Sequence, residues 1–170
     1  MRVGILKTHQ GGLTKRLQQG VAAVEMGLMT MFLVTTAGVA TEFGRAISQY
    51  DTLAKSARSA ARYLATHNST DVIQQALYRN QAQNIALCGV LTCGVGVPPV
   101  VPNLTATHIL VSTPDNSAAL ANISTGGFGT LDIVTVTISP GSNFPFTSLM
   151  LGIIPSFNFG PISVTMPTVL

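Results

Sequence analysis

An apolar stretch near the N-terminus constrains the fold more than any other part of the chain. The 16 residues 26–41 carry no charge, and a helix over residues 21–41 would be about 31 Å long, close to a hydrocarbon core of about 30 Å. The uncharged part alone would reach only about 24 Å, so the span must include Glu25. We therefore expect one transmembrane helix over 21–41, with a carboxylate inside the membrane that needs a partner.

The charge distribution orients this span. The first 20 residues hold four basic residues and no acidic one: Arg2, Lys7, Lys15 and Arg16. The remaining chain holds five basic and six acidic residues, a net charge of −1, so the pI of about 9.2 comes from the N-terminal segment and does not indicate nucleic-acid binding. By the positive-inside rule, the N-terminus is cytoplasmic and the residues after 41 face the periplasm.

The residues around the start of the span resemble a known family. Gly20 before Val21, Glu25 and the apolar run resemble the class III signal of type IV pilins and pseudopilins. Within that class, three segments resemble TadE-like proteins, the minor pseudopilins of tight-adherence (Flp-type) pili: Gly-Val-Ala-Ala-Val-Glu-Met-Gly-Leu at 20–28, Glu-Phe-Gly-Arg at 42–45 and Ala-Arg-Ser-Ala-Ala-Arg-Tyr at 57–63. The resemblance covers residues 16–65. Met26 departs from it, because the family usually has Phe there.

This resemblance implies a function in pilus assembly. A prepilin peptidase would cut after Gly20, remove the leader 1–20 and leave a new ammonium group on Val21, which could pair with Glu25 in the same chain or in a neighbour. The implied partners are other pilins and pseudopilins of the same pilus, the prepilin peptidase and the inner-membrane assembly platform. The implied location is the bacterial inner membrane, crossed once. Two alternatives stay open: an uncleaved, single-pass periplasmic protein that binds an envelope partner, and a type II secretion pseudopilin, which fits 57–63 less well.

Helical periodicity continues beyond the span. Apolar residues recur at alternating steps of four and three, which predicts an unbroken helix to about residue 65. We call these residues the helix seam: Phe43, Ile47, Tyr50, Ala54, Ala57, Ala61 and Leu64. The seam could pack on the protein's own globular part or on another helix. Asp51 and Lys55, four residues apart, can form an ion pair beside it.

A second helix and a linker follow. His67 and residues 68–70 interrupt the first helix, and Asp71 with Gln74 resembles a capping box that starts a helix over 72–87. Glycines and prolines predict an irregular linker over 88–103. Cys88 and Cys93 lie at its start; with no nearby His they cannot complete a zinc site, and their spacing differs from that of a Cys-x-x-Cys redox motif. We expect a disulfide, which the periplasm would permit, with two buried free thiols as the alternative.

The period changes to alternation after the linker. Strands are predicted over 108–112, 134–139 and 162–166, which favours a small, mostly antiparallel sheet. The predicted fold is therefore α+β and pilin-like: leader 1–20, transmembrane helix 21–41, periplasmic helical segment 42–87, linker 88–103 and a β-rich head 104–170. Residues 133–170 carry no charge, and the aromatic residues between the last two strands must cover either the helix seam or a neighbouring subunit.

No constellation in the sequence indicates catalysis. His9, His67 and His108 are scattered, and no nucleophile or carboxylate pair accompanies them at a useful spacing. The glycines Gly126, Gly127 and Gly129 do not open a helix with Lys-Ser/Thr, so they are interpreted as turn residues and not as a phosphate loop. We expect no enzyme activity, no catalytic residue, no metal site and no cofactor.

Overall fold

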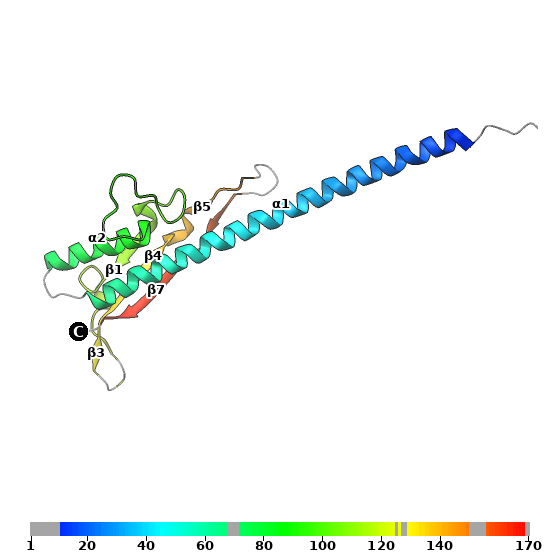
Figure 1. Ribbon diagram of the computed structural model, residues 1–170. Helices are drawn as coiled ribbons and strands as arrows, with labels where there is room; N and C mark the ends of the chain where they lie inside the picture. Colours follow the sequence, from blue (N-terminus) through cyan, green and yellow to red (C-terminus); the bar gives the residue numbers. More distant parts are fainter. Residues whose placement is uncertain (1–10, 68–71, 125, 127–128, 150–155, 169–170) are drawn as a thin grey trace, which may run out of the picture. The chain divides into compact units, whose positions relative to one another are not determined.

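The structure, a computed structural model, describes residues 11–67, 72–124, 126, 129–149 and 156–168 (Figure 1). The chain divides into two compact units, Met1–Glu42 and Phe43–Leu170. In the first unit, all described residues are helical. We call the second the globular unit; it contains the rest of the first helix and every other element.

Two α-helices confirm the predicted helical segments. Helix α1 (Gly11–Thr66) runs unbroken to the predicted end, although it already begins inside the segment predicted as a leader. Helix α2 (Val72–Cys88) matches the predicted second helix, whereas Asp71 of the predicted capping box lies outside the described residues. Gly89 ends α2 in the left-handed region, with φ 77°, and donates its N–H to the Ile85 carbonyl at 2.9 Å.

The three predicted strands form one antiparallel sheet with the order β1-β4-β7. These strands are β1 (Ile109–Ser112), β4 (Ile133–Ile138) and β7 (Ile162–Pro167). In the central strand, Val136 lies opposite both Val111 and Val164. The prediction that β1 begins at His108 is wrong: His108 closes a 3-10 turn, η1 (Ala106–His108), and its N–H bonds the Thr105 carbonyl at 3.0 Å instead of a strand partner.

One hydrophobic core holds the globular unit together. Alternation along β4 buries Val134, Val136 and Ile138 on one face of the sheet. The same core contains a row of buried small residues and a leucine on α1: Ala57, Ala60, Ala61 and Leu64. This part of α1 therefore belongs to the same compact unit as the sheet and is not a separate helical domain.

Two short hairpins were not predicted from the sequence. One pairs β2 (Ile123–Ser124) with β3 (Thr130–Leu131), and the other pairs β5 (Phe144–Phe146) with β6 (Phe157–Phe159). Two more 3-10 turns, η2 (Ala118–Leu120) and η3 (Pro140–Ser142), lie in the connections. Three phenylalanines of this uncharged segment, Phe144, Phe146 and Phe159, are buried in the protein's own core, whereas Phe157 is 43% exposed.

After Cys88, the last residue of α2, the predicted linker is irregular as far as residue 103, but it is held against the core. Val101 is buried, and the Val100 N–H donates to the Leu87 carbonyl of α2 at 2.8 Å. Residues of the predicted helical segment, of the linker and of the β-rich head all contribute to one core.

Candidate processing site, membrane anchor and assembly surface

Gly20 occupies a helical position at which the fold does not require glycine. It lies inside α1 without a positive φ, and among the described residues no heavy atom lies within 4 Å of where its Cβ would be. Glycine in a helix interior costs about 1 kcal/mol relative to alanine. Gly27 has the same open surroundings, so Gly20 is distinguished by its place directly before Val21.

Val21 and Glu25 lie four residues apart on α1, so they share one helix face. Both side chains are exposed, and within residues 20–67 the structure gives Glu25 no ion-pair partner. The pairing of Glu25 with a freed N-terminus stays a prediction.

Residues 20–41 of the first unit form a helix with exposed apolar side chains. The large apolar residues from Val21 to Val34 are all at least 60% exposed, and this helix is long and apolar enough to cross a membrane. Its hydroxyls are compatible with lipid, because Thr30, Thr35 and Thr36 each donate to the carbonyl four residues earlier, at 2.8, 2.8 and 2.9 Å. A helix that is apolar on every face is typical of a membrane span or of a helix buried inside a protein core.

The helix seam divides into a buried and an exposed part. Its C-terminal members are buried in the core of the globular unit: Ala54, Ala57, Ala61 and Leu64. Its N-terminal members stay exposed, at 67% for Phe43, 54% for Ile47 and 48% for Tyr50. The buried part of the seam therefore packs within the protein's own globular unit, and the exposed part remains accessible to another helix. The predicted ion pair beside the seam is present, with Lys55 Nζ 2.6 Å from Asp51 Oδ2.

Arg45 connects α1 to the β5–β6 hairpin. Its guanidinium donates to the Thr147 carbonyl at 2.6 Å and lies 4.9 Å from the centre of the Phe146 ring, a cation–π arrangement. Ser139 fixes the base of the same hairpin: its buried hydroxyl donates to the Phe159 carbonyl at 2.9 Å and accepts from the Phe144 N–H at 3.1 Å. The hairpin is thus fastened both to α1 and to the end of β4.

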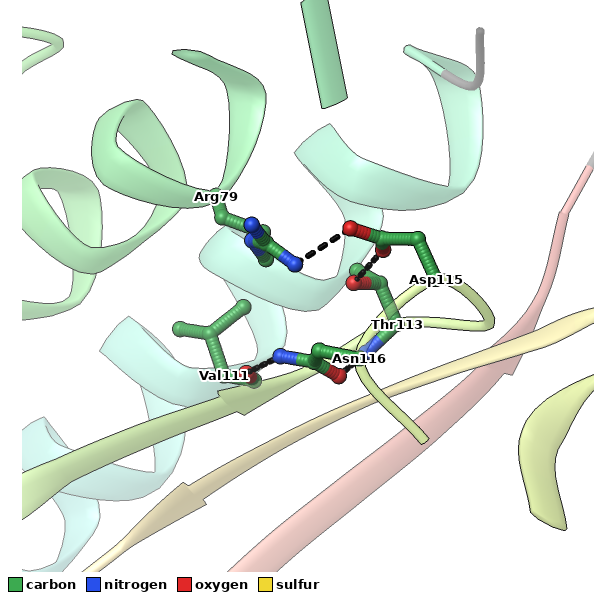
Figure 2. A network of polar contacts seen from close by, with 5 residues as sticks. All are labelled: Arg79, Val111, Thr113, Asp115 and Asn116. Carbon is green, nitrogen blue, oxygen red and sulfur yellow. Dashed lines mark hydrogen bonds and ion pairs between the residues drawn. The ribbon is translucent and has the colours of Figure 1, made fainter. Parts of the chain in front are cut away.

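A polar network fastens α2 to the sheet (Figure 2). The Arg79 guanidinium on α2 pairs with the Asp115 carboxylate in the turn after β1, and the Thr113 hydroxyl donates to the same carboxylate. Asn116 closes this turn: its amide accepts from the Thr113 N–H at 2.8 Å and donates to the Val111 carbonyl at 3.0 Å. The sequence analysis did not identify this network, although Thr-Pro-Asp-Asn at 113–116 is a recognisable turn sequence that places an acidic side chain after a strand.

The two cysteines are bonded in the structure. Cys88 and Cys93 form a disulfide, with a Cα–Cα distance of 6.1 Å. The small loop between them is also held by Asn84, whose amide donates to the Leu91 carbonyl at 2.9 Å. The disulfide therefore closes the C-terminal end of α2 onto the segment that returns to the core.

The described histidines have structural surroundings. His67 stacks on Tyr63 with ring centres 4.2 Å apart, and His108 meets the Phe144 ring edge-on at 5.2 Å. Tyr63 also donates to Gln81 Oε1 on α2 at 2.5 Å, and burial, with a smaller contribution from Tyr78, raises the pKa of Tyr63 above its ordinary value. His9 lies outside the described residues. In the part of the chain that the structure describes, no three His, Cys, Asp or Glu side chains gather as a metal site.

The fold and its anchor define a class: membrane proteins whose single N-terminal helix continues into a small α+β unit. Residues 20–62 match the family model of TadE-like proteins, which confirms the resemblance predicted from the sequence over these residues. The match covers about a quarter of the chain, from Gly20 through the span to the buried part of α1. No curated protein and no solved structure matches the chain. TadE-like proteins are a structural, non-enzymatic kind of protein associated with tight-adherence pili, and the match together with α1 supports a membrane-anchored pilus protein.

Proposed function

We propose that this protein is a minor pseudopilin that takes part in assembling a tight-adherence (Flp-type) pilus, after a prepilin peptidase has cut it behind Gly20. The observation that carries the proposal is the family match, which begins at Gly20 and runs through the exposed apolar helix. Cleavage there would remove four basic residues and leave the membrane anchor attached. The mature helix would remain in the bacterial inner membrane, with the globular unit in the periplasm.

The partners follow from the surfaces that the helix leaves open. A carboxylate in an apolar surrounding is costly unless an opposite charge lies nearby, and at a low dielectric constant such a pair attracts strongly. The new ammonium group of Val21 supplies this charge only after cleavage. We propose that Glu25 of one subunit binds the freed N-terminus of another pilin or pseudopilin, so that processing permits assembly on the inner-membrane platform.

Substitutions of Glu25 test this role. Glu25→Ala and Glu25→Gln should leave membrane insertion and cleavage unchanged, because neither step needs the ion pair, but should reduce cross-linking to partner pilins at least tenfold and abolish pili. Glu25→Asp keeps the charge and should retain a substantial part of the assembly. The measurement is cross-linking in membranes of the native host, with pili counted by electron microscopy.

Normal cross-linking and wild-type pili in the Glu25→Gln variant would contradict the ion-pair role. A loss of cleavage in that variant would instead show that Glu25 is read by the peptidase.

A further inference from the structure

We propose that the outer edge of β7 pairs, in antiparallel orientation, with β7 of a second copy of this chain, so that the two three-stranded sheets join into one. The observation that carries the proposal is a difference between the outer strands β1 and β7 (Figure 1). The protein's own side chains cap the outer backbone groups of β1 but not those of β7. The proposal goes beyond the proposed function and depends on neither cleavage nor the membrane anchor.

The outer edge of β1 is occupied. The hydrogen bond that extends the β1–β4 ladder beyond Ile109 fixes its alternation, so that Ile109 and Val111 direct their backbone groups away from β4. The Ile109 carbonyl accepts from Gln83 Nε2 on α2 at 3.3 Å, and the Val111 carbonyl accepts from Asn116 Nδ2 at 3.0 Å. The Ile109 N–H donates to the Ala106 carbonyl. A further strand would have to displace these contacts to pair here.

The outer edge of β7 carries no such caps. Beyond the end of the β4–β7 ladder, the Thr168 N–H donates to the Asp132 carbonyl at 2.9 Å. By alternation from this bond, the backbone groups of Ser163 and Thr165 face away from β4. Both residues are exposed, and the structure gives their backbone groups no partner among the described residues. An open strand edge of this kind is a template for another strand.

Two prolines bound this open edge. Pro161 and Pro167 occupy the outward-facing positions on either side of Ser163 and Thr165. A proline has no N–H and cannot donate to a ladder. The donors of the outer edge are therefore the N–H groups of Ser163 and Thr165, in the middle of the strand.

The hydrogen-bonding pattern of this edge is complementary to itself, which favours a second copy over an unrelated strand. In an antiparallel pair with Ser163 opposite Thr165 of the second copy, each residue donates its N–H and accepts at its carbonyl. Pro161 then lies opposite Pro167, so that every outward N–H of both strands has an acceptor. Such a pair is related by a two-fold axis, the commonest symmetry of homo-oligomers.

The side chains on both faces of β7 match in the same register. On the exposed face, hydroxyls already bond across the sheet, Thr135 to Thr165 at 2.9 Å and Thr137 to Ser163 at 2.5 Å. The pairing places the Ser163 hydroxyl beside the Thr165 hydroxyl of the second copy and so continues these rows. On the other face, the half-buried Val164 lies opposite Val164 of the second copy, and cross-strand pairs of β-branched residues stabilise a sheet.

Charge and topology determine how far the pairing extends. Charged side chains on an outer strand commonly prevent pairing, but residues 133–170 carry no charge, so the two β7 strands bring no like charges together. The joined sheet has a capped β1 at each end. The pairing therefore stops at two copies and gives a dimer, not a fibre.

Disulfide cross-linking of the full chain in detergent micelles tests the pairing. Val164→Cys places a cysteine opposite its own copy, where the Cα atoms of a non-hydrogen-bonded pair are about 4.5 Å apart, a separation that a disulfide spans. Leu110→Cys on β1 is the control, because Leu110 is 51% exposed and so more accessible than Val164. Cys88 and Cys93 are bonded and provide no free thiol. Under a mild oxidant, Val164→Cys should form the cross-linked dimer several-fold faster than Leu110→Cys.

Two further changes, each combined with Val164→Cys, test the backbone bonds. Thr165→Pro removes an outward N–H and should lower the cross-linking rate several-fold, yet it should keep the pairing with β4, as Pro167 does at its outward position. Thr165→Val removes the hydroxyl but keeps the N–H, and should retain most of the cross-linking. Circular dichroism of both variants should match that of the Val164→Cys protein.

Equal cross-linking at positions 164 and 110 would overturn the proposal, because association through any other surface brings the two cysteines together by collision. A rate that Thr165→Pro leaves unchanged in the folded protein would also overturn it. Neither result bears on cleavage at Gly20, which the measurement does not require.

Discussion

At the scale of single residues, Gly20 and Glu25 are unfavourable choices for the helix that contains them. Neither a positive φ nor a close neighbour explains the glycine, and the carboxylate interrupts an otherwise apolar surface without an ion-pair partner in residues 20–67. Residues that lower local stability, and that no contact or backbone conformation in the fold explains, are often functional. Both residues were singled out from the sequence by their spacing along the chain, which does not depend on tertiary structure, and their roles stay predictions.

The disulfide gives a prediction at this scale. The natively isolated, unreduced protein should resist alkylation, whereas Cys88→Ser and Cys93→Ser should each expose one reactive thiol. Each change should lower the free energy of unfolding by about 2 kcal/mol, the loop-closure contribution for a short loop. Intact mass after alkylation and thermal unfolding in detergent provide the two measurements. The double variant serves as the control, because it should match either single variant in stability.

Alkylation of both cysteines in the untreated wild-type protein would contradict the bond.

At the scale of elements, the periodicity of the sequence predicted the two long helices and the strands of the three-stranded sheet, but not the short strands of the two hairpins. The alternation in β4 and β7 predicted the sheet, and the apolar steps predicted α1 as far as Thr66. β5 and β6 were missed because each has three residues, and Pro145 between Phe144 and Phe146 argues against a strand. Their pairing depends on tertiary contacts with Arg45 and Ser139, which no local pattern reveals.

The clamp between α2 and β1 gives a prediction at the element scale. Asp115→Ala should lower the free energy of unfolding by about 1–3 kcal/mol, because it leaves the largely buried Arg79 guanidinium without its carboxylate. Asp51→Ala is the matched control; its partner Lys55 is solvent-exposed, so the loss should stay below about 1 kcal/mol. Chemical unfolding of the full chain in detergent, followed by circular dichroism, measures both. Equal losses in the two variants would show that the pair in Figure 2 contributes no more than a surface ion pair.

At the scale of the whole molecule, the anchor matches a known family, whereas most of the globular unit does not. The anchor resembles a family, and the match to TadE-like proteins ends at residue 62. Most of the globular unit lies beyond that match, and its core could be predicted only as a fold class, because the alanines of α1, the strands and the phenylalanine hairpin meet through long-range contacts. The proposed function therefore rests on the anchor, and the structure adds the core and the internal contacts of the globular unit.

The measurement that tests the central claim most directly is the intact mass of the protein extracted from membranes of its native host. The account predicts one species that begins at Val21 and lacks residues 1–20. Gly20→Val should retain the full-length mass, because peptidases of this class read the small residue before the cut. Gly27→Val changes a glycine with equally open surroundings and should be processed normally. A full-length wild-type protein in cells that assemble pili, or normal processing of Gly20→Val, would contradict the account.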